Sequence, residues 1–386
     1  MNLAQVIQLH RNGDLVAAEQ GYRNLISSSP ESAEAYGNLA LICLGAGRID
    51  EAIELLKASL SIDSSNPESH LNLGVAFREK KDLAAAISCY EAALQLKADY
   101  PDAHNNLGVA LCEQGRYKQA IESYRTAVKL RANYPEAYYN MGNALRGDGN
   151  LDEAAAAYAQ AVKLNPKDLM AYLNLGNIAQ DQQNWDAAYS CYKDALAVDP
   201  KFAEAHNNLG NVFREQGKRT EAIRSYKKAL DLLPGHQHAK FNLAVLQASE
   251  GHLEEAADSY REAIALNPDH PQAHFNLGIV LSRQGNLPGA VACYYEALRV
   301  NSLNADAHNN LGAVLCELGH LQDAIISYRK ALALRPKYAE ALYNLGNVLR
   351  FTGNLPDAIA SYKKAIEIKP DSAVAYLNLG NTYPAL

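Results

Sequence analysis

The chain has 386 residues, of which 48% are hydrophobic and 20% charged, with a formal net charge of -7 and an isoelectric point near 5.9. The acidic excess is spread along the chain and no basic stripe is present to meet a phosphate backbone, so nucleic acid is not an expected partner. No apolar run reaches about eighteen residues and the N-terminus lacks a signal-peptide pattern, which predicts a cytoplasmic protein that does not span a membrane.

The main feature of the sequence is a period of 34 residues, which appears when the chain is compared with itself. An asparagine recurs at each step and is followed by Leu, or once by Met141, and then by Gly or Ala. Alanines from Ala18 to Ala358 and tyrosines from Tyr22 to Tyr362 keep the same spacing, with Leu56 at one place in the tyrosine series. We call the first series the asparagine comb. Its members are Asn38, Asn72, Asn106, Asn140, Asn174, Asn208, Asn242, Asn276, Asn310, Asn344 and Asn378.

In chain order, the period predicts a degenerate repeat over residues 1–32, ten full repeats over residues 33–372, and the truncated first helix of a further repeat over residues 373–386. In each repeat, apolar residues at three-to-four spacing predict a first helix that carries the comb asparagine, and a glycine such as Gly217 ends it. The alanine and tyrosine series predict a second helix. Because Pro384 interrupts the last helix and no polar capping helix follows, we expect a fragment or a shortened form of a longer parent.

The repeat resembles the tetratricopeptide repeat over essentially the whole chain. The shared pattern is an aromatic residue or His early in the first helix, Leu-Gly after the comb, then Ala, Tyr and Ala, and a closing Pro. The resemblance implies an all-α fold, a right-handed α-solenoid superhelix of helix hairpins. Small residues let the two helices of a hairpin approach closely, and neighbouring hairpins stack because one alone cannot bury its apolar face. It also implies a concave groove that is lined by the first helices and binds a protein or peptide.

The asparagine comb is the main candidate site. Residues at the comb position and three further on share one helix face, and a carboxamide can both donate to and accept from a peptide bond. The comb is similar to the asparagine ladder of O-linked N-acetylglucosamine transferases, which grips the substrate backbone. The alternative is that these side chains support the groove through hydrogen bonds within the array. The predicted peptide-binding residues are Asn72, Asn106, Asn140, Asn174, Asn208, Asn242, Asn276, Asn310 and Asn344 of the comb, with Asn143, Asn177, Asn211 and Asn347 three residues on.

A longer period of six repeats is also present. Residues 101–134 and 305–338 share 20 of 34 positions, and the segment 171–177 reappears as 375–381. Duplication of a six-repeat block is the simplest explanation, and it predicts two similar binding surfaces along one array.

Other candidate sites are weaker. Histidines in the first helices, such as His70 and His104, lie a repeat or more apart and cannot converge on one metal ion, so no metal or cofactor is predicted. The carboxylate clamp of some tetratricopeptide proteins needs Lys directly before the comb residue, where this chain has Gly, Leu, Asn, Tyr or Phe. No phosphate-binding loop, nucleophile elbow or clustered catalytic set is present, so the chain is not expected to be an enzyme.

The sequence therefore predicts a non-catalytic scaffold that binds an extended peptide or a partner helix in its concave groove. One alternative is the substrate-recognition region of a protein O-glycosyltransferase whose catalytic domain lies outside this chain. Another is self-assembly into a homo-oligomer through end-to-end or groove contacts.

Overall fold

The computed structural model describes residues 1–383, and the prediction made for Pro384 lies outside them. The described residues form 23 α-helices and no strand, which confirms the predicted all-α fold. Within the described part of the chain, no helix is both long enough and apolar enough to cross a membrane.

The helices alternate between a first and a second helix of successive hairpins. The first helices are α1 (Leu3–Arg11), α3 (Ala33–Gly45), α5 (Pro67–Glu79), α7 (Pro101–Glu113), α9 (Pro135–Gly147), α11 (Leu169–Asp181), α13 (Ala203–Glu215), α15 (Gln237–Glu250), α17 (Pro271–Arg283), α19 (Ala305–Glu317), α21 (Ala339–Phe351) and α23 (Ala373–Thr382). The second helices are α2 (Leu15–Ser28), α4 (Ile49–Ile62), α6 (Leu83–Leu96), α8 (Tyr117–Leu130), α10 (Leu151–Leu164), α12 (Trp185–Val198), α14 (Arg219–Leu232), α16 (Leu253–Leu266), α18 (Leu287–Val300), α20 (Leu321–Leu334) and α22 (Leu355–Ile368).

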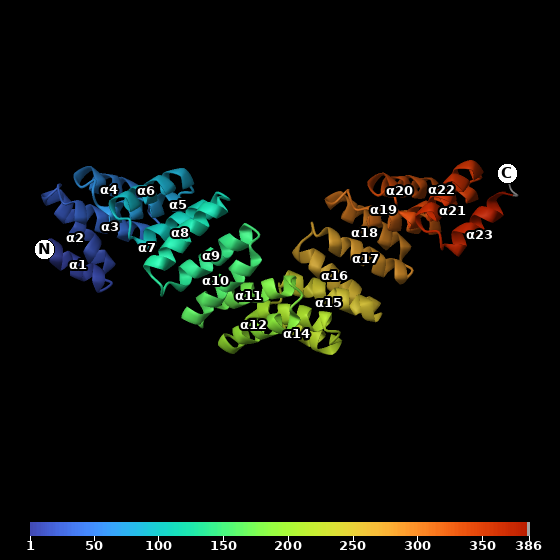
Figure 1. Ribbon diagram of the computed structural model, residues 1–386, viewed down its shortest axis with the longest axis horizontal. Helices are drawn as coiled ribbons and strands as arrows, with labels where there is room; N and C mark the ends of the chain where they lie inside the picture. Colours follow the sequence, from blue (N-terminus) through green and yellow to red (C-terminus); the bar gives the residue numbers. More distant parts are fainter. Residues whose placement is uncertain (384–386) are drawn as a thin grey trace. The chain divides into compact units, whose positions relative to one another are not determined.

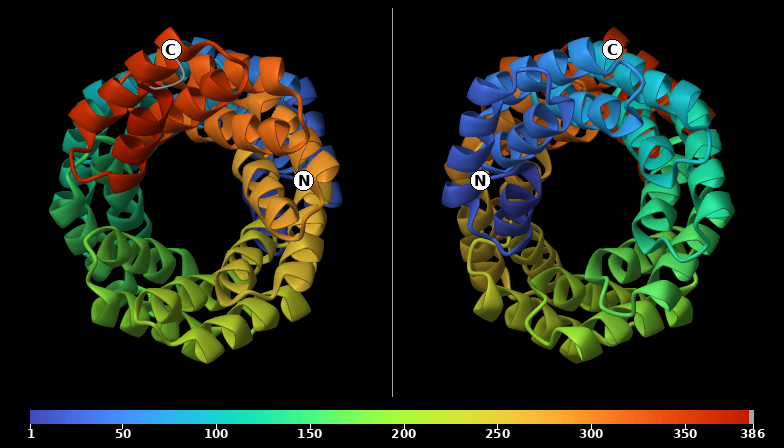
Figure 2. Two further views of the ribbon diagram at one scale, coloured as in Figure 1. Left: turned by 90° about the vertical axis from the view of Figure 1, so that its right-hand side faces the viewer. Right: turned by 90° about the vertical axis from the view of Figure 1, so that its left-hand side faces the viewer.

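The chain divides into two compact units, Met1–Pro200 and Lys201–Leu386, which we call unit 1 and unit 2. In each unit, the second helix of one hairpin packs against the first helix of the next, so that the hairpins form a stack two helices thick (Figures 1 and 2). First helices of neighbouring hairpins also contact each other, for example α7 with α9 and α19 with α21. The second helices of the described residues show no comparable contact. The first helices therefore line the inner, concave side of each unit.

Close packing inside most hairpins comes from a glycine that faces a tyrosine. A Cβ built on Gly176 would lie 2.5 Å from Cε1 of Tyr192, and one on Gly346 would lie 2.6 Å from the same atom of Tyr362. Both tyrosines are fully buried, so the ring has little room to move. The hairpin with Leu56 instead of Tyr has Ala40 at the glycine position, as expected if the two positions share one volume.

The turn between the two helices requires a left-handed residue. Glycine has a positive φ at eight of these turns from α3 onward: Gly47, Gly115, Gly149, Gly217, Gly251, Gly285, Gly319 and Gly353. Two turns of unit 1 instead place Lys81 at a φ of 66° and Gln183 at 58°. A residue with a Cβ pays about 1–2 kcal/mol for this conformation, so these two turns are strained.

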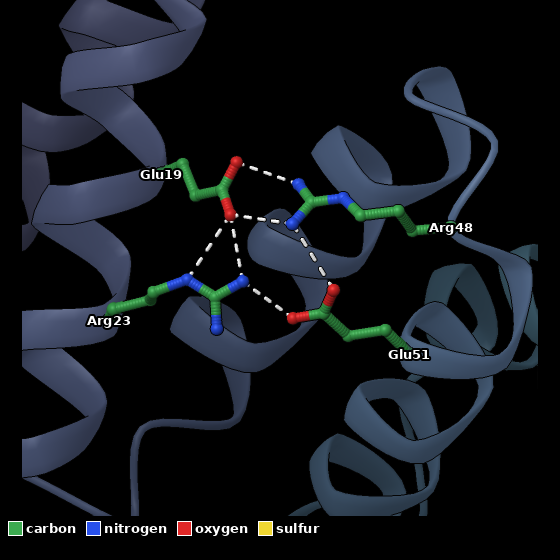
Figure 3. Close-up of polar contacts among 4 residues, drawn as sticks. All are labelled: Glu19, Arg23, Arg48 and Glu51. Carbon is green, nitrogen blue, oxygen red and sulfur yellow. Dashed lines mark hydrogen bonds and ion pairs between the residues drawn. The ribbon is translucent and has the colours of Figure 1, made fainter.

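An ion-pair cluster joins the first two second helices (Figure 3). Arg48, just before α4, contacts Glu19 of α2 at 2.7 Å, and Arg23 of α2 contacts both Glu19 at 2.7 Å and Glu51 of α4 at 2.5 Å. Hydrogen bonds from Arg48 and Arg23 hold the pKa of Glu19 at about 2. The cluster therefore favours an ionised Glu19 and ties the two hairpins together at neutral pH.

Candidate functional site

The comb asparagines lie on the concave side of each unit. From α3 onward each is the sixth residue of a first helix, and residues three and seven positions later share its face. The comb side chains are half-buried, except that Asn174 is only 6% exposed. The predicted site residues therefore follow the inner surface, but Asn174 lies beneath it.

In unit 2, several comb side chains connect neighbouring hairpins. Nδ2 of Asn242 donates to Oδ1 of Asn207 at 3.1 Å and to Oδ1 of Asn211 at 3.0 Å. Nδ2 of Asn344 donates to Oδ1 of Asn309 at 3.3 Å. Hydrogen bonds to buried partners contribute about 1 kcal/mol each. These side chains of unit 2 thus tie one hairpin to the hairpin before it.

In unit 1, the same connection is made by Asn140, whose Nδ2 donates to Oδ1 of the buried Asn105 at 3.2 Å. Asn174 is engaged at both ends, because it donates to the hydroxyl of Tyr139 at 3.4 Å and accepts from Arg146 at 3.2 Å. Both the oxygen and the nitrogen of the Asn174 carboxamide therefore form hydrogen bonds within unit 1.

The asparagines three residues after the comb accept a hydrogen bond from the tyrosine of the same hairpin. The donor–acceptor pairs are Tyr158–Asn143 at 2.7 Å, Tyr192–Asn177 at 2.8 Å, Tyr226–Asn211 at 2.9 Å and Tyr362–Asn347 at 2.8 Å. Each pair fixes the carboxamide oxygen toward the hairpin interior. The amide nitrogen of the same side chain is thereby directed away from the tyrosine.

Helices α9 and α21 each carry an asparagine oxygen and an asparagine nitrogen that form no hydrogen bond among the described residues. Within the described residues, Oδ1 of Asn140 and of Asn344 accepts no hydrogen bond, and Nδ2 of Asn143 and of Asn347 donates none. Each helix, α9 and α21, thus carries an open acceptor and an open donor one helical turn apart. Such a pair matches the N–H and C=O groups of an extended chain.

The other predicted comb residues differ from this arrangement. Asn208 and Asn310 each accept from the asparagine that precedes them in sequence, at 2.9 Å and 3.4 Å. Asn276 accepts from a glutamine one turn earlier at 3.0 Å. Asn72 and Asn106 make no side-chain hydrogen bond with other described residues and are half-buried. The comb is uniform in sequence but not in its free hydrogen-bonding capacity.

A cleft of about 720 Å³ opens beside Asn347 in unit 2. Its lining residues are Cys316, Glu317, Gly319, Leu321, Asn347, Val348, Arg350 and Phe351. Phe351 lies on the same helix face as Asn344 and Asn347, and its side chain is 79% exposed. The sequence prediction missed Phe351. The sequence alone could have identified Phe351 as unusual, because the equivalent position in the other repeats is occupied by Gly, Ser or a charged residue.

Sequence profiles of the tetratricopeptide repeat match nearly the whole chain. Profiles described as tetratricopeptide repeat cover residues 9–76, 135–168, 173–237, 208–271, 241–299 and 303–371, and one described as TPR repeat covers residues 76–112, 110–147 and 283–319. The chain belongs to the tetratricopeptide repeat family. Such an architecture is a protein-interaction scaffold and is typically non-catalytic.

Solved structures share the tetratricopeptide fold at low sequence identity. The Cut9–Hcn1 hetero-tetramer of the APC/C is 14% identical over 98% of this chain and 95% of that chain, with a TM-score of 0.50. The C-terminal part of a TPR repeat-containing protein from Cytophaga hutchinsonii is 18% identical over 63% and 99%, with a TM-score of 0.53. YrrB, described as a TPR protein with an unusual peptide-binding site, is 22% identical over 48% and 96%, with a TM-score of 0.43. No curated protein matched the chain.

The histidines of the tetratricopeptide hairpins hold the loops between repeats. Nε2 of His70, His104, His274 and His308 lies 2.9–3.3 Å from the backbone carbonyl six residues earlier. The described residues contain no group of three or more side chains placed to hold a metal ion. The cysteines are unpaired, and burial raises the pKa of Cys43 and of Cys191 to about 11, so both are neutral thiols. The cytoplasmic location and the exclusion of nucleic acid stay predictions.

Proposed function

We propose that the chain is a non-catalytic scaffold that holds an extended peptide along the concave face of its tetratricopeptide hairpins. The observation that carries the proposal is the pair of open groups on α9 and on α21. Asn140 and Asn344 offer an acceptor oxygen, and Asn143 and Asn347 offer a donor nitrogen. A peptide that lies across such a pair can satisfy one N–H and one C=O without regard to its side chains.

The fixed orientation of these carboxamides favours binding. Asn344 is held through its Nδ2 by Asn309 at 3.3 Å, and Asn347 is held through its Oδ1 by Tyr362 at 2.8 Å. The remaining atom of each side chain is therefore already positioned, and little rotamer entropy is lost when a peptide binds. Support of the groove and recognition of a ligand are thus two functions of one carboxamide, carried by different atoms.

The cleft beside Phe351 would supply selectivity. Its walls combine the apolar side chains of Leu321, Val348 and Phe351 with the charged groups of Glu317 and Arg350, neither of which forms an ion pair across the cleft within the described residues. A peptide side chain with an aromatic ring can lie against Phe351 while its backbone contacts Asn347. The recognition region of an O-glycosyltransferase and self-assembly stay predictions from the sequence.

The test compares two substitutions that differ in the acceptor oxygen. Peptides are selected from a display library of random twelve-residue sequences, and their affinities are measured by fluorescence anisotropy. The double variant Asn140→Ala, Asn344→Ala removes both acceptors and is expected to weaken binding about tenfold per contacted site. The double variant Asn140→Asp, Asn344→Asp keeps an acceptor oxygen at each place and is expected to retain most of the affinity. Asn133→Ala, in an exposed loop, is the matched control.

Both double variants lose the Nδ2 hydrogen bond to the preceding hairpin. The aspartate variant should lose at least as much stability as the alanine variant, because a carboxylate oxygen then faces Oδ1 of Asn105 and of Asn309. Unchanged peptide affinity in the alanine variant, with a loss of thermal stability, would mean that the comb only supports the groove. Failure to select any peptide would also overturn the proposal.

A further inference from the structure

A second cleft lies on the outer side of unit 2, away from the asparagine face. It has a volume of about 570 Å³ and is formed by α18 and α20, with the beginning of α19 between them. Its apolar lining includes Tyr295, Leu298, Ile326 and Leu334. The second helices form the outer layer of the stack, so this cleft does not belong to the concave groove (Figures 1 and 2).

Large apolar side chains around this cleft are unusually exposed. Tyr295 is 52% exposed and Ile326 is 44% exposed. Leu303, in the loop next to the cleft residue Ser302, is 73% exposed. Single exposed apolar residues are common on protein surfaces, but a cluster at a concavity is typical of an interaction site.

The six-repeat period of the sequence supplies an internal control for this cluster. The positions 204 residues earlier in unit 1 hold Glu91 in place of Tyr295, Asp99 in place of Leu303 and Glu122 in place of Ile326. All three acidic residues are exposed. The same outer surface is therefore acidic in one block and apolar in the other, although the frameworks beneath them are closely similar.

The charged groups at the cleft differ between the units in both directions, with a net gain of positive charge in unit 2. Gln95 and Thr126 of unit 1 correspond to Arg299 and Lys330 of unit 2, and both cations line the cleft. In the opposite direction, Gln119 and Lys129 of unit 1 correspond to Asp323 and Ala333. Arg299 is paired with Asp269 and Glu296 at 2.7 Å each, whereas Lys330 has no ion-pair partner among the described residues. Asp323 is the acidic group in the lining, and it lies in the first turn of α20, where the helix dipole stabilises a negative charge. Lys330 is thus a cation at the cleft without a matching anion.

We propose that the α18–α20 cleft is a second docking site, for an amphipathic protein segment that combines apolar and acidic side chains. The apolar face of the segment would cover Tyr295 and Ile326, and one of its carboxylates would pair with Lys330. This occupant follows from charge complementarity. Relative to its unit 1 counterpart, the surface lacks three acidic groups and one lysine and has two further cations and one further aspartate, a net change toward positive charge, and Lys330 is unpaired. A scaffold with this site would hold one partner in its groove and a second on its outer face.

The test uses two synthetic sixteen-residue amphipathic peptides, labelled with fluorescein, that share an apolar Leu/Phe face. One carries Glu on its polar face and the other carries Lys. The full chain is expected to bind the Glu peptide at least tenfold more tightly than the Lys peptide. Equal binding of the two peptides, or binding of neither, would overturn the proposal.

Two variants locate the binding. Tyr295→Glu with Ile326→Glu restores the acidic residues of unit 1 and should reduce affinity for the Glu peptide at least tenfold. Lys330→Glu should weaken the Glu peptide and strengthen the Lys peptide, an inversion that simple misfolding cannot produce. Glu91→Gln with Glu122→Gln in unit 1 is the matched control and should leave both affinities unchanged.

The outcome is separable from that of the concave groove. Phe351→Ala should leave binding of the Glu peptide unchanged, because Phe351 lies on a first helix. Sedimentation of the chain alone tests another occupant, a second copy. A dimer that dissociates in the Tyr295→Glu, Ile326→Glu variant would show that copies of the chain cover the cleft and would overturn the proposed partner.

Discussion

Residues 101–134 of unit 1 and residues 305–338 of unit 2 share a set of hydrogen bonds around one aspartate. In the first segment, Asp102 accepts from Arg131 at 2.7 Å and from Tyr134 at 3.0 Å. In the second, Asp306 accepts from Arg335 at 3.0 Å and from Tyr338 at 2.8 Å. The arginine lies over the tyrosine ring at 4.7 Å and 4.6 Å in the two copies. The groups that hold one hairpin to the next have thus been kept.

The two copies differ in the groups that face a ligand. In unit 1, the ring of Tyr117 lies against Gly147, so close that a Cβ there would be 2.7 Å from its Cε1. In unit 2, the same two places hold Leu321 and Phe351, and the cleft of about 720 Å³ opens beside them. The aromatic residue of this pair therefore lies on a second helix in unit 1 (Tyr117) and on a first helix in unit 2 (Phe351). The comparison shows that one framework carries two different surfaces.

Because Tyr117 and Gly147 correspond to Leu321 and Phe351, substitutions at the two unit 1 positions should have strongly coupled effects on the free energy of unfolding. Gly147→Phe alone should destabilise unit 1 by about 3 kcal/mol, because the new side chain meets the ring of Tyr117. Tyr117→Leu with Gly147→Phe recreates the unit 2 pair and should recover most of the loss. The measurement is urea unfolding of the four members of the double-mutant cycle. Additive effects would mean that the two residues are not alternatives for one space.

The comb hydrogen bonds predict equal losses in the two units. Asn140→Ala and Asn344→Ala each remove one bond to the preceding hairpin, at 3.2 Å and 3.3 Å, and should each cost about 1 kcal/mol. Amide hydrogen exchange measured separately on α7–α9 and on α19–α21 would resolve the two effects. A loss confined to one unit would break the equivalence of the two frameworks.

The residue at the turn between the two helices of a hairpin also differs between the units, and we expect a smaller effect on stability from this difference. Both non-glycine residues at the positive-φ turn position, Lys81 and Gln183, lie in unit 1. Gln183→Gly should stabilise unit 1 by about 0.5 kcal/mol, because relief of the left-handed strain exceeds the added entropy of the unfolded chain. Gly217→Gln in unit 2 should destabilise by a similar amount, since its neighbourhood is open and only the φ of 72° opposes a side chain. Thermal unfolding of both variants checks the pair.

The smallest expected effect concerns the ion pairs of α2 and α4. The pKa of Glu19 is lowered in the folded chain to about 2 from a usual value near 4.5, so its stabilising contribution is present above pH 4.5 and is lost as the pH falls toward 2. Glu19→Gln should therefore unfold at a lower temperature than the parent chain at pH 7, and the difference should vanish near pH 2. A difference that stays constant over this range would rule out the ion pair as its cause.

The fold was predictable from the sequence because its determinants recur at a fixed spacing. A glycine that faces a tyrosine, and a glycine at the turn, set the geometry of most hairpins through size and backbone conformation alone. Two hairpins with a tyrosine depart from this pairing in a way that the sequence does not explain. Val6 and Ala244 occupy the position where a glycine faces the tyrosine in the other tyrosine-bearing hairpins, with Tyr22 and Tyr260 as the respective tyrosines. Rules of size and conformation act locally, and local rules can be read from sequence.

The candidate site was only partly predictable because its state depends on neighbours one repeat away. Asn174 and Asn344 are equivalent in the repeat, yet the first is engaged at both ends by Tyr139 and Arg146 while the second keeps an open oxygen. Phe351 likewise lines one cleft with Leu321, which lies thirty positions earlier in the chain. These pairings become visible only when the hairpins are stacked.

The most direct test of the concave-groove account is a backbone scan of a selected peptide. Each peptide bond is N-methylated in turn, and each side chain is separately replaced by Ala, while affinity for the full chain is measured. If Asn140, Asn143, Asn344 and Asn347 bind the peptide backbone, N-methylation should reduce affinity about tenfold at a few defined bonds, and alanine substitution at the same residues should have less effect. Binding that tolerates N-methylation at every bond would contradict the account.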